Sequence, residues 1–344
     1  MNDLQVGLLM VGVVVLLILA GYSVWQVSRR AKHPPGTVLS EWHPSMAKEP
    51  SLMDAGFVGG SLGPSASSAP EKKQGLDALI DVIAPIVLEA PLTGKAVLLA
   101  LPNIRCIGNK PFAVEAMNQN TRHWEFPVVG QYYSQVQSGV QMANRSGALT
   151  DIEFAEFLQK SQVLAAAVKG TCTSPKHSEV QRARELDQFA NDHDAQLRFV
   201  VRSHNTAWSL GGVQQAAAQH GFVPGSTPGR MVMPASVSNS HPLLNLSFDF
   251  QATMVEETTQ SVLSKVVLTL DVTHVSRSEC AYDKMCKVAQ MMAEELGGTL
   301  TDDNGVVLTE AAMETIADEL AHLYDALDRC EFSAGSPLAC RLFS

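Results

Sequence analysis

The residues best suited to metal chemistry form the run Asp302-Asp303-Asn304-Gly305, because oxygen-rich side chains around a glycine are typical of a calcium-binding loop. Aligned on Gly305, the first and twelfth ligand positions of such a loop fall on Leu300 and Ala311. Neither side chain can supply a carboxylate. The run therefore predicts a tight turn rather than a metal site.

The thiols and imidazoles give no stronger signal. Cys280 and Cys286 are six residues apart in a predicted helix, so their side chains do not converge on one metal ion. The histidines are scattered near predicted turns and element ends, and none stands beside a plausible nucleophile. The sequence contains neither a phosphate-binding glycine loop nor a zinc-protease signature. We therefore expect no metal, no cofactor and no enzymatic activity.

The composition narrows the class of protein further. Of the 344 residues, 46% are hydrophobic, and the formal net charge is −10. This is enough apolar material for folded cores. The acidic balance argues against a nucleic-acid partner, because such partners are bound through their phosphates. The length fits one large domain or two ordinary ones, with an appendage.

An uncharged apolar run lies near the N-terminus. From Val6 through Leu16 and Trp25 to Val27 there is no charged residue, and these 22 residues would span about 33 Å as a helix. That length crosses the hydrocarbon core of a bilayer. Because the leader lacks a basic region and the run is long, we expect an uncleaved transmembrane anchor at residues 1–30 rather than a signal peptide.

The charges beside this run predict its orientation. Arg29, Arg30 and Lys32 follow the span, whereas Asp3 precedes it. Basic residues favour the cytoplasmic side of a membrane. We therefore expect a single-pass protein of a bacterial inner membrane, with a periplasmic N-terminus and cytoplasmic globular domains whose six cysteines stay reduced.

The composition changes after the span. Residues 31–75 are rich in proline, glycine and serine without a sustained hydrophobic period, which is typical of a flexible linker. The pattern then becomes that of a folded protein. We expect a first α+β repeat at 76–195, a second domain at 196–330 and a C-terminal tail at 331–344.

The two predicted domains share the element order β-α-β-β-β-α-β-α. In the first, we expect strands at 79–88, 111–117, 123–128 and 132–143, helices at 93–101 and 150–168, then Gly170-Thr-Cys-Thr173 and a further helix. In the second, we expect strands at 196–202, 229–234, 243–250 and 264–272, a helix ending at Gly221, and helices at 279–296 and 309–328 around Gly298-Thr-Leu-Thr301. The similar segments Gly170-Thr-Cys-Thr173 and Gly298-Thr-Leu-Thr301 fall at corresponding places and favour a duplicated unit. Chance similarity of element order is the alternative.

Hydrophobic spacing supports these elements. Thr150 and Glu153 form the signature of a capping box at the start of a helix. Near the C-terminus, one apolar stripe with helical spacing comprises Met313, Ile316, Leu320, Leu323 and Leu327. Leu244, Leu246 and Phe248 alternate with polar residues, as in a strand with one buried face. Short connections between strands predict antiparallel sheets, each with helices on one face and an uncovered second face.

The uncovered face of the second sheet is the candidate binding site. By alternation it should carry Arg198, Val200 and Arg202 from one strand. A second strand should add Val267, Thr269 and Asp271. A sheet face of this kind suits a short helix or an extended peptide.

Met231 and Met233 alternate with Arg230 and Val232, which leaves two interpretations open. Methionines on the uncovered face would give an adaptable apolar surface for a peptide. Alternatively, the methionines lie in the core and Val232 points outward. The sequence barely separates the two, and we place Met231 and Met233 on the uncovered face.

Five segments carry a resemblance to a known family. They are AWSLGGVQQAAAQHGFV (207–223), GRMVMPAS (229–236), HPLLNLSFDF (241–250), KVVLTLDVTHV (265–275) and KVAQMMAEELGGTLTDDNGVVLTEAAMETIADELAHLYDAL (287–327). On these segments, residues 197–327 resemble the C-terminal FtsZ-binding domain of the ZipA family of cell-division proteins. The anchor, the basic cluster and the proline-rich linker also look like that family.

The resemblance implies a membrane tether for FtsZ, a tubulin-like polymer whose C-terminal tail would bind the exposed sheet face. In the family the tail lies in a shallow, mostly apolar groove, to which Met231, Met233, Val267 and Thr269 would contribute here. The family has a bulky aromatic residue where Thr269 falls. The linker is short for the family, and residues 76–195 form an extra domain whose segment 112–117 corresponds to the groove strand.

Two other classes of function are compatible with the sequence. A membrane-anchored enzyme or small-molecule sensor would use a cleft between the two repeats, with converging polar groups and perturbed titratable residues. An outward-facing adhesion or envelope module would place the cysteines outside the cytoplasm.

Overall fold

A computed structural model describes residues 75–204, 207–236, 241–248 and 262–344. The chain divides into the units Met1–Ala69 and Pro70–Ser344, and the described residues belong to the second. The expected anchor and its basic cluster therefore lie outside the described residues. Within the described ranges, no helix is both long and apolar enough to cross a membrane. The anchor and the linker stay predictions.

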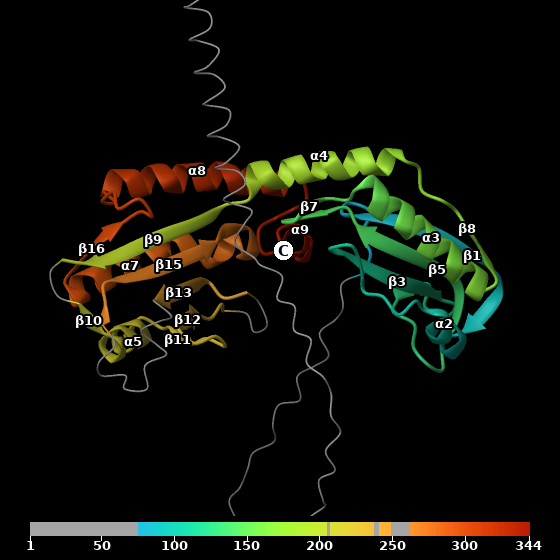
Figure 1. Cartoon of the computed structure of the whole chain (residues 1–344), viewed down its shortest axis with the longest axis horizontal. Helices are drawn as coiled ribbons and strands as arrows, with labels where there is room; N and C mark the ends of the chain where they lie inside the picture. The colour runs from blue at the N-terminus through green and yellow to red at the C-terminus, as the bar shows by residue number, and fades with distance from the viewer. Residues whose placement is uncertain (1–74, 205–206, 237–240, 249–261) are drawn as a thin grey trace, which may run out of the picture. The chain divides into compact units, whose positions relative to one another are not determined.

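The first half of the described chain forms an antiparallel sheet with helices (Figure 1). Its strands follow the order β2-β3-β5-β1-β8, with β4 paired to the outer side of β3. In chain order, its elements are β1 (Asp81–Thr93), α2 (Gly94–Ala100), β2 (Cys106–Ile107), β3 (Lys110–Asn118), β4 (Trp124–Glu125), β5 (Tyr132–Gln141), β6 (Ala143–Asn144), β7 (Gly147–Ala148), α3 (Asp151–Ala167), β8 (Gly170–Cys172) and α4 (Ser178–His193).

The second half contains a second antiparallel sheet, of order β11-β12-β13-β15-β9-β16. A separate two-stranded pair joins β10 to β14. In chain order, its elements are β9 (Gln196–Ser203), β10 (Trp208–Ser209), α5 (Leu210–Gln219), β11 (Val223–Pro224), β12 (Arg230–Met233), β13 (Leu244–Phe248), β14 (Val262–Leu263), β15 (Lys265–Asp271), α7 (Ala281–Leu296), β16 (Gly298–Thr301), α8 (Glu310–Arg329) and α9 (Pro337–Leu342). Mixed α/β structure with antiparallel sheets is thus confirmed.

The long helices begin and end close to their predicted limits. The Thr150 hydroxyl accepts the Glu153 N–H at 3.2 Å, and the Glu153 carboxylate accepts the Thr150 N–H at 2.8 Å, which completes the capping box. Helix α8 follows an N-cap at Thr309. Its apolar stripe is buried or half-buried, as expected.

Each sheet buries one face against helices. In the first half, alternate residues of β1 form a core with Phe154, Phe157 and Leu164 of α3, which lies along the sheet (Figure 1). In the second half, alternate residues of β9, β13 and β15 form a core with the apolar sides of α5, α7 and α8. The helices that contribute to each core therefore lie on one side of their sheet, as predicted.

The strand expected at 123–128 is largely absent from the first sheet. Only Trp124 and Glu125 pair, and they join the outer side of β3, so β3 contacts β5 directly. Pro127 has no N–H to donate to a ladder, and Gly130 has a positive φ of 93°, so the chain turns away after Glu125. The segment 112–117 accordingly corresponds to β13, not to the 229–234 strand as expected.

Gly170 and Gly298 occupy matching places in the two sheets. Gly170 pairs with Leu88, and Gly298 pairs with Ser203. A Cβ on Gly170 would lie 2.7 Å from the Val87 carbonyl oxygen, and one on Gly298 would lie 2.8 Å from the Arg202 carbonyl oxygen. Both positions therefore need glycine for the same reason. The duplication of the whole unit stays a prediction.

Residues 331–344, set apart above as a tail, contain helix α9 and pack against both halves of the described chain. Leu342 and Phe343 are completely buried in a third apolar cluster that also contains Ile80, Ala190 and Leu327. The Gln141 side-chain amide donates to the Arg341 carbonyl at 2.8 Å. The C-terminal segment is therefore an integral part of the fold.

Truncation of Phe343 tests this role. We expect Phe343→Ala to lower the free energy of unfolding by about 3–5 kcal/mol, because it leaves a cavity where the ring was. The control Leu99→Ala changes a side chain that is 79% exposed and should cost less than about 0.5 kcal/mol. Urea denaturation measures both, and equal losses would contradict the assignment.

Candidate partner-binding face

The open face of the second sheet is built from side chains that alternate with the core. Cross-strand partners share a face, so the ladder registers fix which residues are neighbours. One row across the sheet runs Arg230, Ser247, Val267, Val200, Thr301. The next row runs Val232, Asn245, Thr269, Arg198. We call these two rows, with Lys265 and Arg202, the open face.

The centre of the open face is apolar and shallow. Val267 is half-buried and lies between Ser247 and Val200 in the ladder. A small depression beside it is lined by Ser247, Phe248, Lys265 and Val267. Such a surface offers a limited apolar contact within a mainly polar surround.

The rim of the open face is basic. It carries the cations Arg198, Arg202, Arg230 and Lys265. The Arg198 guanidinium lies 3.6 Å from the Asp303 carboxylate, and both side chains are more than half exposed, so this ion pair is weak. The Arg202 Nε donates to the Thr301 hydroxyl at 3.3 Å. The arrangement favours a ligand that carries carboxylates.

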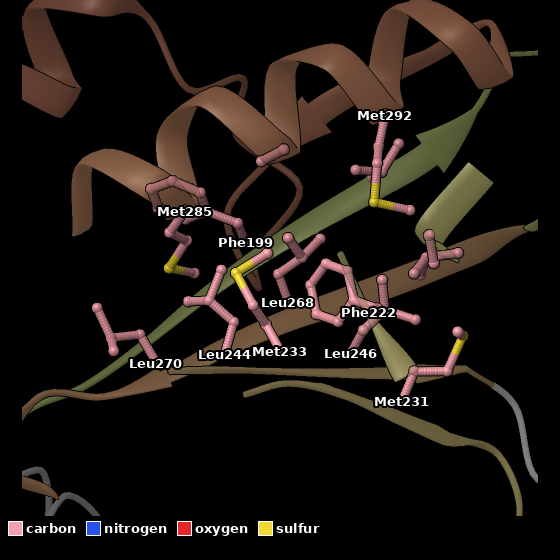
Figure 2. Close-up of a cluster of buried hydrophobic side chains, with 14 of the residues drawn as sticks. Phe199, Phe222, Met231, Met233, Leu244, Leu246, Leu268, Leu270, Met285 and Met292 are labelled. Atoms are coloured by element: carbon pink, nitrogen blue, oxygen red, sulfur yellow. The ribbon is translucent and has the colours of Figure 1, made fainter. Parts of the chain in front are cut away.

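Met231 and Met233 do not lie on the open face, which corrects the placement made from the sequence. They are 4% and 8% exposed and belong to the core cluster. Figure 2 shows Met233 extending toward the helix that carries Met285. Val232, half-buried, takes the outward position. In this four-residue strand one phase is Met231 and Met233 and the other is Arg230 and Val232, so each phase holds an apolar residue and the pairing of β12 with β13 decides which phase is buried.

The other predicted residues lie on the open face but differ in exposure. Arg198 is exposed, and Arg202, Val267 and Thr269 are half-buried. Val200 is only 2% exposed because Val267 and Thr301 flank it in the ladder, so it supports the face without offering contact area.

Sequence reasoning missed two contributors. Lys265 pairs with Arg202 at the end of the ladder. Val307, which is 56% exposed, forms a single bridge with Thr301 and so extends the first row. Its signal in the sequence was the Asp302–Gly305 turn, where the Asp302 carboxylate accepts the Val306 N–H at 2.7 Å. Within the described residues, no group of acidic, cysteine or histidine side chains is arranged to hold a metal ion.

Asp271 lies beyond the two rows and binds the first half of the chain. Its two carboxylate oxygens accept from the Arg145 guanidinium at 2.8 and 2.9 Å, and Arg145 also donates to Asp194. Burial on its own would raise the pKa of Asp271, but hydrogen bonds and charge from His274 and Arg145 hold it far below its usual value. The carboxylate is therefore ionised at neutral pH.

The polar hollow beside Arg145 is where the alternative enzyme or sensor would place its site. Asn144, Asp187, Asn191 and Asp194 line it with Arg145. The guanidinium of Arg145 already donates to two carboxylates, which makes it a bridge within the fold.

Replacing Asp271 with asparagine tests this bridge. The carboxylate stabilises the folded state above its unfolded pKa of about 4, and this contribution declines as the pH falls below that value. We expect Asp271→Asn to lower the free energy of unfolding by about 1–3 kcal/mol at pH 7 and by less at pH 3. Urea denaturation at both pH values measures the difference, with the exposed Asp283→Asn as control. A loss independent of pH would refute the electrostatic role.

Comparison with known proteins identifies part of the second half. A family model described as the ZipA C-terminal FtsZ-binding domain matches residues 243–319. No curated protein sequence matches the chain closely enough to count as a relative. The match covers β13, β15, α7, β16 and half of α8, and it confirms the resemblance to the ZipA family within that segment.

Proposed function

We propose that the chain is a membrane-anchored cell-division protein that binds the C-terminal tail of FtsZ on the open face of its second sheet. The observation that carries this proposal is the match of residues 243–319 to an FtsZ-binding domain. Those residues supply β13 and β15, which form the centre of the open face. The proposal requires binding only, with no catalytic turnover.

The chemistry of the open face suits a short peptide. Val267 gives an apolar contact at the centre, and Asn245 and Ser247 give hydrogen-bonding groups beside it. The basic rim attracts carboxylates, which speeds encounter and orients the ligand. A mainly polar face with one apolar centre predicts modest affinity for a single tail.

Anchoring compensates for modest affinity. The predicted linker has a root-mean-square reach of about 35–40 Å, so the globular part would stay close to the inner face of the membrane. A polymer presents many tails to many anchored copies, and the effective concentration then raises the overall affinity. We therefore propose a tether of the FtsZ polymer to the inner membrane.

Substitution of Val267 tests tail binding. We expect Val267→Glu to weaken binding of a synthetic FtsZ tail at least tenfold (about 1.4 kcal/mol), because it buries a charge at the apolar centre. Met291→Glu is the matched control, since Met291 is 50% exposed on α7 and away from the open face. Fluorescence anisotropy with the purified full chain measures both. Unchanged affinity of Val267→Glu would exclude this face.

The orientation in the membrane has its own test. Cys106, Cys280 and Cys330 are exposed in the fold. We expect a membrane-impermeant maleimide to label them only after spheroplasts are permeabilised, because the proposed topology places them in the cytoplasm. Labelling in intact spheroplasts would instead support an outward-facing module.

A further inference from the structure

The first sheet also has a side that faces away from its helix α3, which we call the open face of the first sheet. The ladder registers show which of its residues correspond to those on the open face of the second sheet. Gly170 lies beside Val87 as Gly298 lies beside Arg202. Val87 pairs with Gln135, and Arg202 pairs with Lys265. Counting along β5 and β15 from this pair makes Gln137 the counterpart of Val267, and Gly139 the counterpart of Thr269. In the same way Glu115, which pairs with Gln137, is the counterpart of Ser247.

A segment of the chain already lies on these positions in the first sheet. We call residues 75–77 the incoming segment. A Cβ on Gly139 would lie 2.4 Å from the Leu76 Cδ2 atom, so the leucine side chain rests directly on this glycine. Gly139 pairs with Ala113 and Ile83, on the side of the sheet away from α3. The incoming segment therefore covers the centre of this side of the sheet, whereas Val87, Ala113 and Gln135 around it stay exposed.

Hydrogen bonds hold the backbone of the incoming segment. The Leu76 N–H donates to Glu115 Oε1 at 3.0 Å, and the Gln137 side-chain amide donates to Glu115 Oε2 at 2.9 Å. Glu115 and Gln137 are each 8% exposed. A buried carboxylate that accepts a backbone N–H is a strong, directional contact.

Arg341 of the C-terminal segment also binds the incoming segment. The Arg341 guanidinium donates to the Gly75 carbonyl at 3.2 Å and to the Asp81 carboxylate at 2.6 Å. Asp81 is 2% exposed, and its second oxygen accepts the Asp77 N–H at 2.8 Å. Both ends of the three-residue segment are thus tied to the fold, with Leu76 between them.

We propose that the incoming segment is an internal ligand that occupies the counterparts of Ser247, Val267 and Thr269 on the first sheet and so closes them to a peptide, so that each chain binds one FtsZ tail, through the second sheet. The stoichiometry rests on the proposed function, whereas the closure does not. A tail that competes for the first face must displace a ligand joined to it covalently, whose effective concentration is high.

Hydrogen exchange tests the closure without FtsZ. In the full chain we expect the Leu76 amide to exchange at least tenfold faster in Glu115→Ala than in the wild type, because its acceptor is gone. Gly139→Val should have the same effect by displacing the leucine side chain. Glu89→Ala, at an exposed position within β1, is the matched control and should leave the rate unchanged. Wild-type exchange of Leu76 at the rate of an unprotected amide would overturn the closure.

Calorimetric titration with a synthetic FtsZ tail tests the stoichiometry. We expect one peptide per wild-type chain, bound at least tenfold more weakly by Val267→Glu. Two peptides per wild-type chain would show that the first face is open and would refute the proposal. If the wild type bound no peptide, the proposed function would fail, and the exchange rate of Leu76 would still decide the closure.

Discussion

The architecture of this protein depends on burying one face of each sheet against helices. Successive strand residues point to opposite faces, so covering one face fixes the register of every strand in the sheet. Leu246 and Leu268 meet in the ladder and both lie in the core, which forces Ser247 and Val267 to the other side. The side chains that the helices do not cover are then free to differ between the sheets, and the proposed recognition of a peptide rests on that difference.

Sequence periodicity predicted the long helices and the strands with strict alternation. Helix α8 has one apolar stripe, and β13 has apolar residues on one side only. The sequence therefore left one choice for the side that is buried in each element. Met231 and Met233 were misplaced because β12 has only four residues and each of its two phases contains an apolar side chain. The packing of residues 331–344 was missed because Leu342 and Phe343 show no period in so short a segment. The prediction of a strand at 123–128 was wrong beyond Glu125, because Pro127 has no N–H to donate to a strand ladder.

The two halves share a pairing scheme but present different chemistry on their open faces. Thr269 in the second sheet stands where Gly139 stands in the first, and Val267 stands where Gln137 stands. The glycine leaves room for a leucine of the same chain, and the glutamine orients the carboxylate that holds it. This correspondence between the two sheets could not be predicted from the sequence, because the residues at matching positions differ in chemical type.

The Arg341 contacts have a mechanical consequence in the proposed membrane tether. Any pull transmitted along the linker reaches the fold at Gly75, whose carbonyl is held by Arg341, and then at Asp81, held by the same guanidinium. Tension is therefore borne by the first sheet and the C-terminal helix α9. In the proposed tether, a pull would therefore be shared between β1 and the C-terminal helix before it reaches the second sheet, so the load does not pass through one strand alone.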